Sequence, residues 1–177
     1  RRAMPGAEWF PGARLNYAAQ ALRHERAGED AIVYLSERQP LRSMSWLEFA
    51  RQVRVLATWM RSIGIQPGDP VLAYLPNTPE AIVAMYATAS IGAVWSSCGP
   101  DFGARGVLDR YSQLAPKLII CVDGYSYGGK LFDKRAEIRH IIDGLPTLAH
   151  VVHLPYLDPT DLTPLTPRSR FCVMPWS

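Results

Sequence analysis

The feature that most constrains the fold is an alternation of short apolar runs with longer amphipathic stretches between residues 31 and 154. The short runs have the length of buried strands, and the stretches between them repeat apolar residues at helical spacing. We predict strands over these segments: Ala31–Leu35, Val71–Leu75, Ala93–Ser97, Leu118–Val122 and His150–Leu154. Alternating strands and helices favour an α/β fold with a parallel sheet flanked by helices on both faces.

The predicted helices carry start and stop signals. Ser45–Glu48 has the form of a capping box, and Gly64 ends the helix that follows. Thr78–Pro79 starts a helix that is apolar nearly all round as far as Ile91, which predicts burial on more than one face. We expect two further helices, one with an apolar stripe over Ala104–Leu114 and one over Leu131–Ile142.

Three regions follow from these elements. Residues 1–30 form an N-terminal arm with one short helix around Asn16–Arg26, and residues 31–154 form the α/β subdomain. Residues 155–177 contain prolines at 155, 159, 164, 167 and 175 without any period, so we expect an irregular, Pro-rich tail. Because Arg1 is not a translation start, we expect a truncated or processed polypeptide.

Composition argues against several classes of protein. The formal net charge is +3, and the densest basic run, Lys130–Arg139, is interrupted by Asp133 and Glu137, which argues against a nucleic-acid surface. The sequence has no apolar run approaching the roughly 20 residues of a membrane helix. We therefore expect neither nucleic acid nor membrane as a partner.

Cysteines and histidines give no sign of a reactive or metal site. Cys98, Cys121 and Cys172 are odd in number and form no C-x-x-C pair, which favours a reducing, cytoplasmic compartment. We interpret Cys121 as a core residue and Cys98 as a packing residue rather than a nucleophile. His150 and His153 would point to opposite faces of a strand, so we expect no shared metal.

Two glycine-containing loops are candidate binding sites. Gly124–Lys130 fits G-x-x-x-x-G-K, but Leu131 stands where a P-loop needs Ser or Thr. The amides of Gly128 and Gly129 at a helix start, with the Lys130 ammonium, could hold an anion; the alternative is an ordinary helix start with a solvated lysine.

The second loop, Gly99–Gly103, follows a predicted strand and opens a helix. Gly99 and Gly103 would allow close backbone approach or positive φ, and Asp101 could cap the helix. The alternative is a tight strand-to-helix turn without a ligand.

Several segments resemble one family. WFPGARLNY (residues 9–17) is similar to the opening of acetyl-CoA and acetoacetyl-CoA synthetases, and residues 44–102 follow the general adenylate-forming pattern. SSCGPDFG and DGYSYGGK resemble the acetoacetyl-CoA synthetases more narrowly. The resemblance identifies the chain as the N-terminal part of an AMP-forming acyl-CoA synthetase of this group, with an incomplete N-terminal subdomain.

The resemblance implies a ligase that uses acetoacetate, ATP, Mg²⁺ and coenzyme A. By position, the resemblance assigns coenzyme A contacts to Tyr127, Gly128, Gly129 and Lys130. It assigns the coenzyme A entrance to Gly99, Pro100 and Asp101. Tyr127 stands where the acetyl-CoA synthetases have an arginine. The Thr/Ser-Gly-rich-Pro-Lys loop that wraps the ATP phosphates in this family is absent, so we expect no catalytic residue in the chain, no tightly bound cofactor and no activity of the chain alone.

Two other functions remain open from the sequence. The chain could be a truncated paralogue that acts as a binding or dimerisation module, with self-association as its activity. It could also be a small P-loop-like nucleotide binder that uses Gly124–Lys130. In the ligase hypothesis the partners are the small-molecule substrates and the remainder of the chain's own domain.

Overall fold

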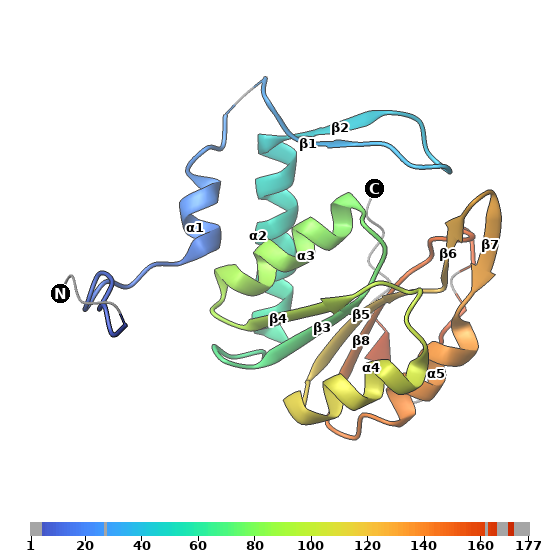
Figure 1. Ribbon diagram of the computed structural model, residues 1–177. Helices are drawn as coiled ribbons and strands as arrows, with labels where there is room; N and C mark the ends of the chain where they lie inside the picture. The colour runs from blue at the N-terminus through green and yellow to red at the C-terminus, as the bar shows by residue number, and fades with distance from the viewer. Residues whose placement is uncertain (1–4, 27, 162, 166–169, 172–177) are drawn as a thin grey trace.

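The computed structural model describes residues 5–26, 28–161, 163–165 and 170–171 (Figure 1). Its helices are α1 (Tyr17–Leu22), α2 (Trp46–Ser62), α3 (Pro79–Ser90), α4 (Ala104–Tyr111), the 3-10 turn η1 (Ser112–Leu114) and α5 (Arg135–Asp143). Its strands are β1 (Asp30–Tyr34), β2 (Arg42–Ser45), β3 (Pro70–Tyr74), β4 (Val94–Cys98), β5 (Leu118–Val122), β6 (Gly124–Tyr127), β7 (Lys130–Asp133), β8 (His150–Leu154) and β9 (Arg170–Phe171).

A parallel sheet in the order β4-β3-β5-β8-β9 forms the centre of the fold. Helix α3 connects β3 to β4, which lies on one side of β3. The strand that follows in the chain, β5, lies on the other side of β3. The predicted α/β class is therefore confirmed. The order also creates a topological switch point between β3 and β5, where the connecting segments diverge.

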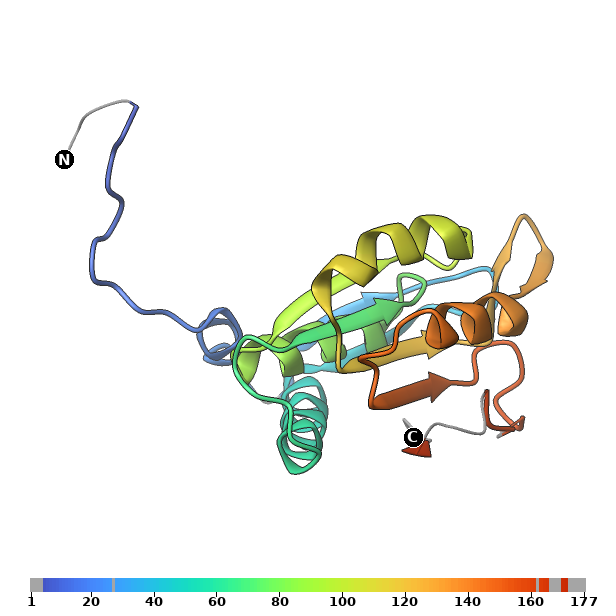
Figure 2. The same cartoon turned by 90° about the horizontal axis from the view of Figure 1, so that it is seen from below.

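The sheet separates two hydrophobic cores because successive side chains of a strand point to opposite faces. Along β5, Leu118, Ile120 and Val122 pack with residues of α2 and α3, whereas Ile119 and Cys121 pack with residues of α4 and α5. Figures 1 and 2 show these helix pairs on opposite faces. All five residues of β5 are buried, as expected for a strand covered on both sides.

Local signals explain the helices. The Ser45 hydroxyl accepts a hydrogen bond from the Glu48 amide at 3.2 Å, which is one half of the predicted capping box. The Glu48 carboxylate instead binds Arg51 and Gln52. Helix α3 packs against both α1 and α2, so its apolar surface is covered on more than one side, as predicted. Among the described residues, no helix is long and apolar enough to cross a membrane.

Three expectations about the elements need correction. The predicted strand at residues 31–35 pairs antiparallel with β2 in a separate hairpin and does not join the parallel sheet. The predicted helix over Leu131–Ile142 begins only at Arg135, because residues 124–133 form the β6–β7 hairpin. In the tail, Arg170–Phe171 adds β9 to the edge of β8, so the tail is not wholly irregular.

The N-terminal arm extends away from the layers (Figure 2). Trp9, Phe10 and Leu15 are 75%, 81% and 90% exposed. The arm is tied to the domain at Asn16, whose side-chain amide donates hydrogen bonds to the Ala89 and Ser90 carbonyls at 2.9 and 3.2 Å. The same side chain caps α1 through the Ala19 amide, so the short helix starts where it meets α3.

Candidate functional site

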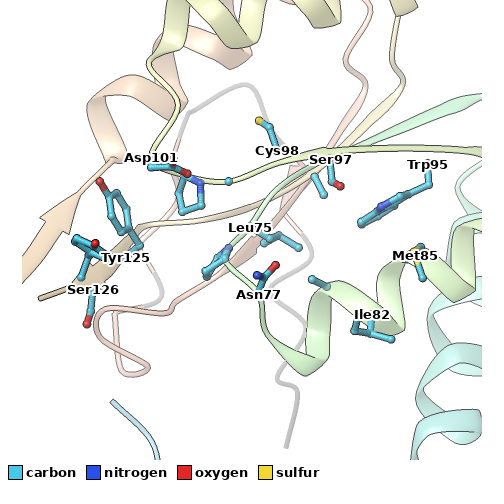
Figure 3. A pocket seen from close by; sticks show the side chains of 16 residues that line it. Leu75, Asn77, Ile82, Met85, Trp95, Ser97, Cys98, Asp101, Tyr125 and Ser126 are labelled. Atoms are coloured by element: carbon cyan, nitrogen blue, oxygen red, sulfur yellow. The ribbon is translucent and has the colours of Figure 1, made fainter. Parts of the chain in front are cut away.

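Segments that follow three neighbouring strands line a cavity of about 830 Å³ (Figure 3). Residues 75–77 follow β3, residues 97–101 end β4 and enter the next loop, and residues 125–127 belong to the hairpin after β5. In an open α/β sheet, ligands bind outside the carboxyl ends of the strands, close to the switch point. The cavity occupies this position and is the candidate site.

The cavity is apolar at one end and polar at the other (Figure 3). Ile82 and Met85 from α3 and Trp95 from β4 line the apolar end. Asp101 and Ser126 belong to the opposite end, where the loop after β4 meets the β6–β7 hairpin. Such a lining suits an elongated ligand with one apolar and one polar part.

A buried tyrosine that the sequence analysis did not single out holds the loop after β4. Tyr74, at the end of β3, is fully buried, and its hydroxyl lies 2.8 Å from the Pro100 carbonyl oxygen and 2.6 Å from that of Phe102. Burial raises the pKa of Tyr74 far above its usual range, so the hydroxyl remains a donor. A tyrosine at the end of an apolar strand could have indicated such an anchor, since a buried tyrosine hydroxyl needs a hydrogen-bond partner.

The structure contradicts the expected helix cap in this loop and the expectation for one of its two glycines. Asp101 does not cap α4, because the N-cap is Gly103 and no side chain supplies a capping hydrogen bond there. Neither Gly99 nor Gly103 has a positive φ. Close approach does apply at Gly99, where a Cβ atom would collide with the Asp101 carboxylate, whereas a Cβ at Gly103 would meet nothing within 4 Å.

The segment Gly124–Lys130 is not a P-loop. It forms β6 and the turn of a hairpin, in which Tyr127 pairs with Lys130 and Gly128–Gly129 is the two-residue turn. A P-loop requires strand, loop and helix in succession. The expected helix start at the glycines is therefore contradicted, and the segment does not have the P-loop geometry on which the nucleotide-binder alternative was based. Two glycines between alternating runs were the missed signal for a hairpin.

The two glycine amides do bind an anion, but it is a carboxylate of the protein. The Gly128 amide donates to Glu37 Oε1 at 3.0 Å, and the Gly129 amide donates to Glu37 Oε2 at 3.1 Å. These hydrogen bonds lower the pKa of Glu37, with the Gly129 amide as the largest cause. The sequence analysis did not single out Glu37, because it lies 91 positions from Gly128.

The cavity brings together only part of the residues suggested by the family resemblance. Gly99, Pro100 and Asp101 line it together with Tyr127. The other three suggested residues, Gly128, Gly129 and Lys130, are exposed at and just beyond the hairpin turn and do not line the cavity. Within the described part of the chain, no ion pair involves Lys130, and the residue is exposed.

The cysteines and histidines behave as packing residues. Cys121 is fully buried, and its thiol donates to the Val152 carbonyl at 3.6 Å. Cys98 borders the cavity at the end of β4, but its side chain packs against the α4–α5 core on the other face of the sheet. Burial raises the pKa of its thiol, which disfavours a thiolate nucleophile. Cys172 lies outside the described residues. His153 is buried among residues of the α4–α5 side, and over the residues that the structure describes, no group of three or more His, Cys, Asp and Glu could hold a metal ion.

A buried carboxylate after β5 was also missed. Asp123 is fully buried, and its Oδ1 accepts hydrogen bonds from the Tyr156 and Leu157 amides at 2.8 and 2.9 Å. Its Oδ2 faces Arg135 at 3.4 Å. The carboxylate therefore ties the segment after β8 to the base of the hairpin, next to the candidate site. Gly124 is required there, because a Cβ atom would collide with the Phe132 carbonyl oxygen.

Comparisons with known proteins define the class. The family model described as AMP-binding enzyme matches residues 18–170, which is most of the chain. The chain therefore belongs to the AMP-binding enzyme family.

Within that family, the chain is similar to acetoacetyl-CoA synthetases. Those of Rattus norvegicus and Rhizobium meliloti (strain 1021) are 43% and 46% identical to it, over 93% and 86% of this chain. The solved structure of acetoacetyl-CoA synthetase from Streptomyces lividans superposes with a TM-score of 0.86 and 48% identity, over 95% of this chain and 26% of that one. The matched regions cover 25% and 23% of the two curated relatives, so the chain spans about a quarter of their length.

Proposed function

We propose that the chain is the N-terminal part of an AMP-forming acetoacetate–CoA ligase. The whole protein would convert acetoacetate, ATP and coenzyme A into acetoacetyl-CoA, AMP and pyrophosphate. The observation that carries the proposal is the meeting of two segments in one cavity. SSCGPDFG and DGYSYGGK, which resemble acetoacetyl-CoA synthetases narrowly, come from different strand ends and line the same cavity.

We place part of the coenzyme A site at this cavity. Gly99, Pro100 and Asp101 would form its entrance, and Tyr127 would lie at its rim with the ring 73% exposed. Lys130, on the strand after the turn, would offer its ammonium to the coenzyme A phosphates. Gly128 and Gly129 would contribute the tight turn that brings Tyr127 and Lys130 into register, rather than their amides.

The chain by itself would be inactive. Adenylate formation needs positive groups that stabilise the charge on the transferring phosphates. The sequence lacks the Thr/Ser-Gly-rich-Pro-Lys loop that does this in the family. We assign ATP and Mg²⁺ to other parts of the whole enzyme. We propose that the chain itself comprises an N-terminal arm (1–30), an α/β subdomain (31–154) and a tail (155–177). A cytoplasmic location accords with the unpaired thiols of Cys98 and Cys121.

The catalytic part is tested by ATP–pyrophosphate exchange. A ligase polypeptide that carries this segment should exchange pyrophosphate in the presence of acetoacetate, and the 177-residue chain alone should not. Exchange by the purified chain that is lost on mutating its own residues would contradict the assignment. Pyrophosphate exchange by the ligase that does not depend on acetoacetate would contradict acetoacetate as the acyl substrate.

The coenzyme A site has a separate test in the same ligase polypeptide. Desulfo-CoA, which has no thiol, should slow alkylation of a cysteine placed at position 97 (Ser97→Cys together with Cys98→Ala), because Ser97 is exposed and lines the cavity. Cys121 is fully buried and serves as the internal control, since its alkylation reports only global unfolding. Unchanged alkylation at position 97 at saturating desulfo-CoA would place coenzyme A elsewhere. Mass spectrometry of the two peptides gives the readout.

A further inference from the structure

The contact between Glu37 and the β6–β7 turn joins two hairpins that are distant in the sequence. Glu37 lies in the turn between β1 and β2, and its carboxylate accepts three hydrogen bonds from the other hairpin. Besides the amides of Gly128 and Gly129, the Ser126 hydroxyl lies 3.1 Å from Glu37 Oε2. Figure 1 shows the tip of the β1–β2 hairpin reaching toward β6 and β7.

The glycine turn is built to present its amides to one acceptor. Gly128 and Gly129 have φ of 58° and 72°, so both are in the left-handed region, as a two-residue type I′ turn requires. This geometry leaves both amides outside the strand ladder. A single carboxylate with two oxygens can satisfy both at once, and hydrogen bonds to a charged acceptor are stronger than neutral ones.

The Glu37 side of the contact is itself held in place. The Ser36 hydroxyl accepts hydrogen bonds from the amides of Arg38 and Gln39 at 3.3 and 3.1 Å. The Arg38 guanidinium donates to the Leu157 carbonyl at 2.8 Å, and the Leu157 amide donates to Asp123. The turn therefore has an anchor on the segment after β8 that is independent of Glu37.

We propose that Glu37 is a positioning residue for the candidate coenzyme A site. Its carboxylate holds the β6–β7 turn against the anchored β1–β2 turn, which sets where Tyr127 lies at the cavity rim and where Lys130 lies just beyond it. The role toward coenzyme A rests on the proposed function, whereas the clamp between the hairpins does not. Glu37 acts through the glycine amides, because these amides are occupied by its carboxylate and not left for a ligand phosphate.

The clamp is tested by hydrogen exchange in a ligase polypeptide that carries this segment. Glu37→Ala should speed exchange of the peptide covering residues 124–133 by about tenfold, because its two turn amides lose their acceptor. Glu37→Gln keeps a carbonyl oxygen and should give an intermediate rate. Glu29→Ala is the matched control, since Glu29 is exposed and its carboxylate contacts Arg26 at 3.7 Å, at the opposite end of the β1–β2 hairpin from Glu37. Equal exchange in Glu37→Ala and the control would overturn the clamp.

The positioning role is tested by kinetics on the same variants. Glu37→Ala should raise the KM for coenzyme A by about three- to tenfold and leave acetoacetate-dependent pyrophosphate exchange unchanged, with partial rescue in Glu37→Gln. A lower KM would overturn the positioning role, because it would mean that the carboxylate competes with the ligand for the amides. Faster hydrogen exchange of residues 124–133 with an unchanged KM for coenzyme A would uphold the clamp, but it would refute the β6–β7 hairpin as part of the coenzyme A site.

Discussion

Replacing Tyr74 with phenylalanine should loosen the loop after β4 without disturbing the sheet. The substitution removes one hydroxyl and keeps the buried ring, so the packing of β3 against α4 and α5 is retained. The hydroxyl has one hydrogen to donate, and two carbonyl oxygens, those of Pro100 and Phe102, lie within 2.8 and 2.6 Å of it. Because Pro100 is buried, water does not readily replace the lost donor.

The magnitude follows from one lost hydrogen bond to a buried acceptor. A buried group left without its partner costs about 1–3 kcal/mol. The loop opens only when this bond breaks, so Tyr74→Phe should shift the opening equilibrium by roughly 5- to 150-fold. The amides of residues 99–103 should exchange faster by that factor, while those of β5 should be unchanged.

The assay is hydrogen exchange followed by mass spectrometry, in a polypeptide that carries this segment. Tyr127→Phe is the matched control, because the Tyr127 ring is 73% exposed and its hydroxyl can bond to water. Equal exchange of residues 99–103 in Tyr74→Phe and wild type would refute the anchoring role. A uniform increase over the whole sheet would also refute it, because it would indicate global destabilisation.

Three further outcomes are expected. In a ligase carrying this segment, Lys130→Ala should raise the KM for coenzyme A about tenfold or more, because one charged hydrogen bond is lost, and it should spare pyrophosphate exchange. Lys130→Arg is the control. An unchanged KM with loss of pyrophosphate exchange would contradict the proposed coenzyme A site. The isolated chain should self-associate in light scattering, since Trp9 and Leu15 are 75% and 90% exposed and edge strands favour association; a monodisperse monomer would refute this. Asp69 accepts hydrogen bonds from Lys117 and the Gln66 amide, and Lys117 is the largest cause of its lowered pKa. The stabilisation should therefore be present above about pH 4 and lost as pH falls through the lower folded pKa, so wild-type and Asp69→Asn melting temperatures should converge in acid; a constant difference would contradict it.

Much of the fold could be predicted from local patterns. The predicted strands at 118–122 and 150–154 have the bounds that the structure shows, because short, mainly apolar runs between turn signals leave little choice. Helix α2 was predicted from its cap, its apolar period and Gly64, whose φ of 86° shows why glycine stands there. These features depend on neighbours a few residues apart, which a single sequence records.

The hairpin at residues 124–133 shows the limit of that approach. The pattern G-x-x-x-x-G-K suggests a P-loop with its two glycines at a helix start, whereas in the structure the glycines form the turn between paired strands. The signal for a hairpin was Gly-Gly between two short runs that can pair as strands. It competed with an apparent helical period of apolar residues from residue 131 onward. In the structure, pairing of residues 130–133 with β6 across the two-residue turn prevails over that helical period.

By itself the sequence determined the α/β class, the order of the parallel strands β3, β4, β5 and β8 with helices between them, and two candidate loops at strand ends. The tertiary structure alone decided that those loops share one cavity, since this depends on the order β4-β3-β5 and not on spacing along the chain. It also decided that Tyr74 anchors one loop and Glu37 the other, across 26 and 91 positions. A hydrogen-bond partner that far away leaves no periodic trace in the sequence, because only the folded backbone brings the two groups within reach.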